Sequence, residues 1–224
     1  NRLVQDLPQQ GAPGSADGFA GDVSSEAGVA ALVAAVEART ERLDILINNA
    51  GRSWGEALGT FPHAAWERVM SLNVAGLFSL TQALLPRLSA AASDDDPARV
   101  VNIGSVMGEV PMGDDAYSYA ASKAAVHHLT KILAKELAPR RITVNALAPG
   151  PFVSRMTAFA TADEVQRAKV GEEVPLGRVG RPADIAGAIV FLCAPAGSYV
   201  TGAILPVSGG INVTTGPPIF GAAS

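Results

Sequence analysis

The sequence predicts one α/β domain built on a doubly wound parallel sheet. Its 224 residues suit a single domain of this class. Short apolar runs of strand length alternate along the chain with longer segments of helical periodicity, which indicates parallel strands with helices on both faces. The apolar runs lack polar alternation, as is typical of strands buried on both sides. No linker or internal repeat divides the chain, so residues 1–224 are predicted to form one domain.

Composition argues against several other classes of protein. Hydrophobic residues make up 48% of the chain and charged residues 17%, which favours a large core over disorder. The net charge of −4 and the lack of a basic block argue against nucleic-acid binding. The single Cys193 cannot form an internal disulfide, and the three histidines lack the spacing of a metal site. No apolar run reaches the ~18 residues of a membrane span and no signal peptide is visible, so we expect a cytoplasmic protein.

The first elements are a loop, a strand end and a helix. Residues 1–20 are polar and rich in glycine and proline, which predicts a loop. Residues 19–23 have the pattern of a short strand end. Ser24 or Ser25 is expected to cap a helix that runs to about Arg39, because apolar residues then repeat at helical spacing.

The middle of the chain alternates strands and helices. Helical spacing covers 62–88 and 116–137. Asn73 lies inside the first of these helices, where asparagine is disfavoured and often marks a bend or a functional position. The strands around these helices are predicted at 43–48, 99–105 and 142–147.

The last third of the chain breaks this rhythm once. Residues 151–180 form an excursion after a strand end, where substrate loops tend to lie, with a helix expected at 162–170. Pro182 then begins a final helix. The last strand is predicted at 203–207, and its Pro206 favours a position at the edge of the sheet.

The predicted helix at 116–137 contains a tyrosine and a lysine four residues apart. Tyr119 and Lys123 share one helical face, so their side chains can meet. A free phenol has a pKa of about 10, and a nearby ammonium group would lower it, which makes the pair a candidate for proton transfer. The alternative is an ordinary surface pair, because this spacing alone is a weak signal.

Polar or glycine-containing segments follow four predicted strands. The carboxyl ends of parallel strands line one edge of an open sheet, where ligands bind. The helix that carries Tyr119 starts one loop after one of these segments. This convergence favours a functional site, with contributions from Asp22, from Asn48 to Gly51, from Ser105 and from Pro149 with Gly150.

These motifs together resemble those of the short-chain dehydrogenase/reductase family. The resemblance covers about 21–211 and implies a Rossmann-like fold and NAD(P)-dependent oxidoreduction. The order and spacing of the motifs fit the family throughout. They are Asn48-Asn49-Ala50-Gly51, Leu72-Asn73-Val74, Asn102-Ile103-Gly104-Ser105, Tyr119-Ala120-Ala121-Ser122-Lys123, Val144-Asn145 and Ala148-Pro149-Gly150.

The resemblance implies a role for each catalytic candidate. Tyr119 would protonate the substrate oxygen during carbonyl reduction, and Ser105 would hold that oxygen. Lys123 would lower the pKa of Tyr119 and hydrogen-bond the nicotinamide ribose, while Asn73 would anchor a water chain to Lys123. Tyr117 is a weaker candidate for the acid because no lysine follows it four residues later.

The resemblance also implies a cofactor site, for NADPH by analogy, with NADH not excluded. One group of residues would contact adenine and its ribose, and another would pass the nicotinamide. Asn145 is interpreted as structural, and Ser122 as packing or helix surface. The first group is Asp22, Val23, Asn49, Ala50 and Gly51, and the second is Pro149, Gly150, Phe152 and Val153, with Tyr119 and Lys123 beside the ribose.

One part of the family pattern is absent from the sequence. The glycine-rich turn that holds the pyrophosphate belongs to a first βα unit, and neither this unit nor the second strand is present. We expect about 50 residues of the family pattern to lie ahead of residue 1. The chain as printed should therefore bind NADPH weakly and gain little thermal stability from it.

Within the family, the motifs most resemble the 3-oxoacyl-[acyl-carrier-protein] reductases, and their rhamnolipid-pathway branch in particular. Residues 51–55, 102–106 and 154–157 carry this finer resemblance. It implies an acyl-thioester substrate, possible contact with an acyl carrier protein, and an apolar excursion at 151–180 that lines the acyl chain with Phe152, Met156 and Phe159.

Two other functions remain open at this point. The chain could be a dehydrogenase of a sugar, polyol or steroid alcohol, or an inactive paralogue that binds a ligand or partner. The family resemblance also implies a homo-oligomer, a dimer or tetramer, with the helices at 62–88 and 116–137 packed between subunits.

Overall fold

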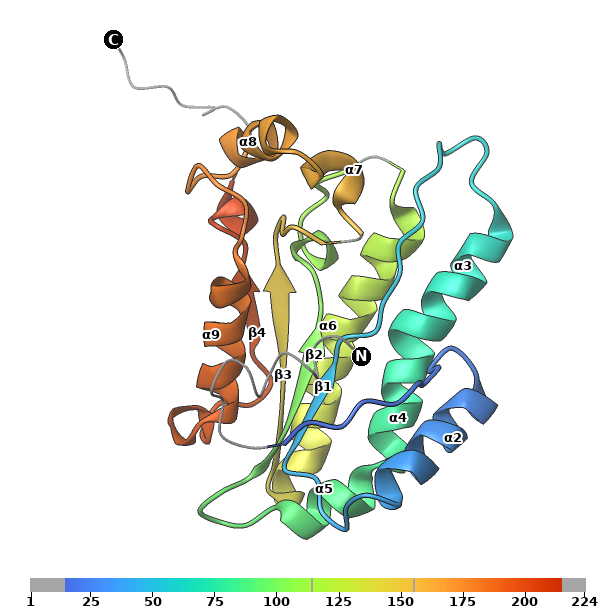
Figure 1. The fold of residues 1–224 in the computed structure, drawn as a ribbon, viewed down its shortest axis with the longest axis vertical. Coiled ribbons are helices and arrows are strands. Elements are labelled where there is room, and N and C mark those ends of the chain that lie inside the picture. The colour runs from blue at the N-terminus through green and yellow to red at the C-terminus, as the bar shows by residue number, and fades with distance from the viewer. Residues whose placement is uncertain (1–14, 114, 155, 215–224) are drawn as a thin grey trace.

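The computed structural model describes residues 15–113, 115–154 and 156–214 (Figure 1). They form a parallel sheet of four strands in the order β1-β2-β3-β4, flanked by helices as the sequence predicts. The predicted loop at 1–14 lies outside the described residues. The strands are β1 (Ile45–Asn48), β2 (Ala98–Ile103), β3 (Ile142–Pro149) and β4 (Ile204–Val207).

The central strands are buried on both faces. In β2, Val100 packs with Leu133 and Leu137 on one side of the sheet, and its neighbour Val101 packs with Leu192 on the other. Because side chains alternate across a strand, a run of apolar residues serves both cores. Continuous apolar runs therefore predicted these strands correctly.

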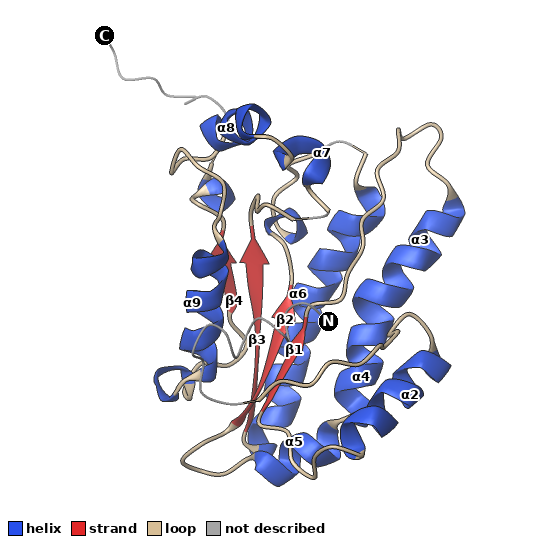
Figure 2. Cartoon of the chain, viewed as in Figure 1, coloured by secondary structure: helices blue, strands red, loops and turns tan. Residues whose placement is uncertain are grey.

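The helices form a layer on each side of the sheet (Figures 1 and 2). The α5 and α6 helices cover one face and α9 covers the other, while α7 and α8 lie beyond the carboxyl ends of β3 and β4. The helices are α2 (Glu26–Glu37), α3 (His63–Met70), α4 (Leu77–Ala83), α5 (Leu85–Ala91), α6 (Tyr117–Leu137), α7 (Ala158–Thr161), α8 (Glu164–Glu172) and α9 (Pro182–Cys193), with short turns η2 (Ser71–Gly76), η3 (Val106–Gly108), η4 (Ala138–Arg140), η5 (Pro195–Gly197) and η6 (Ile211–Val213).

The last strand and the structural asparagine are as predicted. Among the described strands β4 pairs only with β3 and so forms an edge of the sheet, where Pro206 is tolerated. Asn145 donates from Nδ2 to the carbonyl of Val200 at 2.7 Å and accepts from the N–H of Ala203 at 3.0 Å. Its side chain therefore ties β3 to the segment that leads into β4.

The prediction of a strand end at 19–23 is wrong. These residues have no strand structure, because none of the described strands pairs with them. The segment instead packs against two helical glycines, whose lack of a side chain leaves room for its backbone. A Cβ on Gly28 would lie 2.2 Å from the carbonyl oxygen of Asp22, and one on Gly76 would lie 1.9 Å from that of Val23. Helices α2 and η2 can therefore approach this backbone closely.

The prediction that the first strand is buried on both faces is also wrong. Ile45 and Ile47 of β1 are 39% and 41% exposed, whereas Leu46 between them packs into the core beside α5 and α6. Among the described strands β1 pairs only with β2, and the face that carries the two isoleucines is only partly covered.

The long helical region contains the irregularity expected at Asn73. Its helix continues from α3 into α4 through η2, a π-helical turn that includes this residue. Such turns occur frequently at functional sites. In the excursion, α8 begins after Asp163, whose side chain accepts from the N–H of Gln166, close to the predicted start. Among the described helices, no single one is long and apolar enough to cross a membrane, although a bent pair, His63–Ala83 with Leu85–Ala91, passes by length and composition.

Candidate active site

The predicted catalytic pair lies beside the carboxyl ends of the strands. Tyr119 is in the first turn of α6, and this end of the helix faces the edge where β1, β2 and β3 end (Figure 1). Lys123 follows one turn later and is 5% exposed. Its Nζ donates to the carbonyl of Ile103 at 2.7 Å and lies 5.5 Å from the centre of the Tyr119 ring.

Burial shifts the two pKa values in opposite directions. It raises the pKa of the Tyr119 phenol, and a hydrogen bond with Ser105 offsets part of this. It lowers the pKa of Lys123 to about 8. The expected lowering of the Tyr119 pKa is not seen, because removal of the phenol from water raises this pKa by more than its neighbours lower it. In this arrangement Tyr119 stays protonated at neutral pH, as a proton donor must.

Ser105 lies at the point where β2 ends and η3 begins. Its backbone is extended, and its Oγ accepts from the N–H of Met107 at 3.2 Å as the cap of this turn. The hydroxyl group therefore has a fixed position, near enough to Tyr119 to lower the pKa of its phenol. Tyr117, the weaker candidate, packs its ring against Phe61 at 5.4 Å between centroids, which gives it a structural role.

Asn73 joins the helix α3–α4 to the catalytic helix. Its Oδ1 accepts from the N–H of Arg52 at 2.9 Å, and its Nδ2 donates to the Arg52 carbonyl and to Ser122 Oγ, both at 2.9 Å. Both amide hydrogens are thus in use, and a water chain could be anchored only by other atoms of this residue. A Cβ on Gly51 would lie 3.7 Å from Lys123 Nζ, so this glycine borders the site.

Sequence reasoning missed the role of Ser122. This residue is fully buried, accepts from Asn73 and donates to the carbonyl of Tyr119 at 2.7 Å. It therefore fixes the position of the catalytic turn relative to η2. Its place between Tyr119 and Lys123 in the same motif was the available signal.

Sequence reasoning also missed a buried polar chain beneath the site. Asn48 and Asn102 are paired in register on β1 and β2, and Asn48 Nδ2 donates to Asn102 Oδ1 at 2.9 Å. The chain continues from Asn48 to Thr81 on α4 and from Asn102 to Thr130 on α6. The position of an asparagine near the end of two adjacent strands could have indicated this link.

Four of the five residues predicted for the adenosine end share one cavity of 330 Å³, the exception being Gly51. Asp22 accepts from the N–H of Ser24 at 2.9 Å, and hydrogen bonds from Ser24 lower the pKa of its carboxyl group. A carboxylate at the mouth of an apolar cleft fits an adenine and its ribose hydroxyls. The cavity is lined by Gly21, Asp22, Val23, Leu32, Ile47, Asn48, Asn49, Ala50, Leu72, Leu77 and Leu80.

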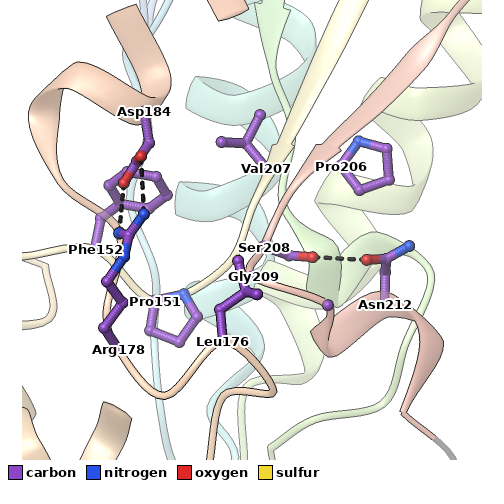
Figure 3. A pocket seen from close by; sticks show the side chains of 12 residues that line it. Pro151, Phe152, Leu176, Arg178, Asp184, Pro206, Val207, Ser208, Gly209 and Asn212 are labelled. Carbon is purple, nitrogen blue, oxygen red and sulfur yellow. Dashed lines mark hydrogen bonds and ion pairs between the residues drawn. The ribbon is translucent and has the colours of Figure 1, made fainter. Parts of the chain in front are cut away.

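The residues predicted for the nicotinamide end follow β3. Gly150 passes so close to Ser208 that a Cβ would lie 2.9 Å from its Cα. Phe152 bridges to Gly180 and lines a cavity of 240 Å³ together with the Arg178–Asp184 ion pair (Figure 3). Val153 lines a separate cavity of 390 Å³ against α8. The two predicted halves of the cofactor site therefore lie at different places along the same edge of the sheet.

Comparison with known proteins agrees with this geometry. A family model described as enoyl-(acyl carrier protein) reductase matches residues 1–212. The rhamnolipids biosynthesis 3-oxoacyl-[acyl-carrier-protein] reductase of Pseudomonas aeruginosa is 47% identical over 200 residues, which are 89% of this chain and 78% of that protein. The galactitol 2-dehydrogenase (L-tagatose-forming) of Cereibacter sphaeroides is 40% identical over 194 residues, 86% of this chain and 74% of that protein.

A solved structure extends the similarity to the fold. The Pseudomonas aeruginosa RhlG/NADP active-site complex has a TM-score of 0.88 and 45% sequence identity to this chain. The similarity covers 93% of this chain and 82% of that one. Fold, site geometry and sequence agree, and the chain belongs to the short-chain dehydrogenase/reductase family.

Proposed function

We propose that the protein is an NADPH-dependent reductase that converts a 3-oxoacyl thioester into a 3-hydroxyacyl thioester. The observation that carries this proposal is the placement of Tyr119, Ser105 and Lys123 at one strand end, in a chain 47% identical to a 3-oxoacyl-[acyl-carrier-protein] reductase. The chemistry needs a proton donor and a hydrogen-bond donor at the carbonyl oxygen, and these side chains provide both.

Each residue has one task in this reaction. The Tyr119 phenol, kept protonated by burial, gives its proton to the substrate oxygen as negative charge develops there. Ser105 Oγ holds the same oxygen. Lys123, with a pKa of about 8, can take up and release a proton near neutral pH and so return one towards Tyr119. The bound cofactor supplies the hydride.

The cofactor would lie along the edge of the sheet between the two predicted groups of residues. Asp22, Val23, Asn49 and Ala50 would hold the adenosine end. The backbone at Pro149 and Gly150, with Phe152 and Val153 beyond it, would pass the nicotinamide. Gly51 would lie between the two ends, beside Lys123. The similar structures with NADP favour NADPH, and one with NADH keeps that cofactor open.

The excursion at 151–180 would receive the acyl part of the substrate. Val153 and Met156 are 52% and 39% exposed, and Met112 before α6 is 40% exposed, so apolar side chains are available to it. The side chain of Phe159 lies outside the described residues. An acyl carrier protein would deliver the thioester, as the names of the similar reductases suggest.

A substrate panel tests this function against its main alternative. Reduction of 3-oxoacyl thioesters, as carrier-protein and coenzyme A conjugates, would be compared with oxidation of galactitol and related polyols, using NADPH, NADH and their oxidised forms. The 40% identity to a galactitol dehydrogenase makes the polyol the second candidate. We expect thioester reduction with NADPH to have the highest kcat/KM. Preference for a polyol would replace this function, and no turnover of any substrate would support the inactive paralogue.

We also propose that the protein is a homo-oligomer that works in the cytoplasm. Trp66, Phe78 and Ile132 lie on α3, α4 and α6 and are 37%, 38% and 47% exposed, which supports subunit packing through these helices. A single cysteine, Cys193, suits a compartment in which thiols stay reduced. Cell fractionation tests the location.

A further inference from the structure

His127 is a buried titratable residue that the proposed reaction does not use. It lies one turn after Lys123 on α6 and is 5% exposed. Its Nε2 accepts a long hydrogen bond, 3.4 Å, from the backbone N–H of Ser105. Its Nδ1 is 3.3 Å from Glu109 Oε1, without a well-formed hydrogen bond between the two atoms. The ring therefore sits between the catalytic loop and a carboxylate that is 42% exposed.

Two glycines make room for this ring. A Cβ on Gly104 would lie 2.2 Å from His127 Nε2, and a Cβ on Gly108 would lie 2.9 Å from Cε1. Both glycines belong to the short segment that carries Ser105, so this segment wraps closely around the imidazole. A change in the position or the protonation of the ring must therefore displace the backbone of Ser105.

The contact defines the protonation state of the ring. Because Nε2 accepts a hydrogen bond, it carries a lone pair, and the neutral ring has its proton on Nδ1, facing Glu109. Protonation would add a hydrogen to Nε2 that points at the Ser105 N–H. Two donors would then face each other in a buried site, and the loop would have to move.

The charged groups around the ring favour the neutral form. Burial lowers the pKa of His127, and the ammonium groups of Lys123 and Lys131 lower it further. The carboxylate of Glu109 acts in the opposite direction and raises this pKa. The imidazole is therefore neutral at the pH where Lys123 begins to titrate, and gains its proton only in acid.

We propose that neutral His127 is a positioning residue for Ser105, and that its protonation releases the catalytic serine and switches off carbonyl reduction. This inference rests on the proposed function, because Ser105 matters only if it holds the substrate oxygen. It assigns the acid limb of the pH profile of kcat to His127. The cofactor affinity should not change across this limb, because His127 does not line the cavity that holds most of the predicted adenosine contacts.

Two substitutions distinguish the role of His127 as hydrogen-bond acceptor for the Ser105 N–H from its role as a ring that fills space and titrates. In His127→Gln a side-chain oxygen can accept from Ser105 but cannot titrate, so kcat near pH 8 should stay within about threefold of wild type while the acid limb disappears. In His127→Phe the ring space is filled but the Ser105 N–H loses its partner, so kcat should fall about tenfold at every pH. Circular dichroism checks that both variants fold.

Two substitutions at the surface are expected to shift the acid limb of the kcat profile while they leave the His127 ring unchanged. Glu109→Gln removes the group that raises the pKa of His127, so the acid limb should move to lower pH. Lys131→Gln removes a group that lowers this pKa, so the limb should move to higher pH. Opposite shifts from the two variants are not expected of residues that only stabilise the fold.

A readout independent of turnover completes the test. The amide resonance of Ser105 in a ¹H–¹⁵N spectrum should shift in a one-proton transition in wild type, and the transition should be absent in His127→Gln. A wild-type protein without reductase activity but with this transition would overturn the proposed function alone. An acid limb and an amide transition that persist in His127→Gln would overturn the role of His127.

Discussion

At the scale of single residues, the site depends on two buried groups whose pKa values move in opposite directions. The phenol of Tyr119 becomes a weaker acid and the ammonium group of Lys123 a stronger one, chiefly because both are removed from water. A protonated phenol is the state required for carbonyl reduction. The lysine then needs only a small change in its surroundings to exchange a proton near neutral pH.

The lowered pKa of Lys123 predicts a pH-dependent cost to stability. Its folded-state pKa is about 8 against 10.5, so the unfolded chain binds this proton more tightly and the cost is fully present below pH 8. The cost disappears as the pH rises through 8 towards 10.5. At about 1.4 kcal/mol per pKa unit, the free energy of unfolding of wild type should gain as much as about 3 kcal/mol relative to Lys123→Met over this range.

Urea unfolding of both proteins at pH 7 and at pH 10 measures this difference. Comparing the two proteins at each pH cancels the contribution of groups that titrate in both. A difference that stays constant, or that moves against wild type as the pH rises, would show that Lys123 is not desolvated as described.

At the scale of elements, the α6 helix holds the end of β2 residue by residue. Thr130 accepts from Asn102, Lys123 donates to the Ile103 carbonyl, and His127 accepts from the Ser105 N–H. These three helix positions lie on one face, since they are four and three residues apart. One helix thereby carries the proposed proton donor and orients the serine proposed to work with it.

Close contact between elements also positions the adenosine end of the site. A Cβ on Gly76 would lie 1.9 Å from the Val23 carbonyl oxygen, so Gly76→Ala should push the segment that carries Asp22 away from the cavity. We expect KM for NADPH to rise about tenfold, with a smaller effect on kcat, because the proton donors are untouched. Steady-state kinetics at saturating thioester measures both constants.

Gly187→Ala is the matched control for this substitution. Gly187 lies inside α9 with no atom within 4 Å of an added Cβ. Alanine there should raise the free energy of unfolding by about 0.5–1 kcal/mol through helix propensity, with KM unchanged. If Gly76→Ala behaves like this control, residues 22 and 23 do not form part of the cofactor site.

At the scale of the whole molecule, the two faces of the sheet have different roles. The α9 face is packed with aliphatic side chains, whereas the α6 side carries the proposed proton donor and, beyond it, exposed aromatic residues on α3 and α4. Exposed apolar side chains that recur over neighbouring helices are typical of a subunit interface. The catalytic helix would then be held by the core on one side and by a partner subunit on the other.

The proposed interface predicts that a charge at its centre dissociates the protein. Phe78 on α4 is 38% exposed, so Phe78→Arg should not disturb the monomer core but should place a charge in the contact. Light scattering after size exclusion should give the mass of an oligomer for wild type and a smaller mass for the variant. A wild-type monomer, or an oligomer unchanged by Phe78→Arg, would contradict an interface through α4.

Much of this architecture follows from local patterns in the sequence. The apolar runs at β2 and β3 predict buried strands, and the disfavoured Asn73 predicts the irregular turn of its helix. The wrong prediction of a strand at 19–23 could not be avoided in this way. A strand forms only when it pairs with another strand, and that partner can lie anywhere in the chain. The role of His127 could not be predicted, because nothing in the neighbouring sequence shows that its ring packs against two glycines about twenty residues earlier in the chain.

The direction of the Tyr119 pKa shift could not be read from the sequence either. A lysine four residues later predicts a lowered pKa, whereas burial of the phenol decides the outcome in the folded chain. Such shifts depend on distances and solvent exposure that helical spacing alone does not give.

The central claim is that Tyr119 donates the proton in carbonyl reduction. The most direct test is the rate of NADPH oxidation with a 3-oxoacyl thioester for the full-length protein and its Tyr119→Phe and Tyr117→Phe variants. Tyr119→Phe should lose about 10²–10⁴-fold in kcat while it keeps its fold and cofactor affinity. Tyr117→Phe, which retains the ring that packs on Phe61, should stay close to wild type. A Tyr119→Phe variant as fast as wild type, or loss of activity in Tyr117→Phe instead, would contradict the account.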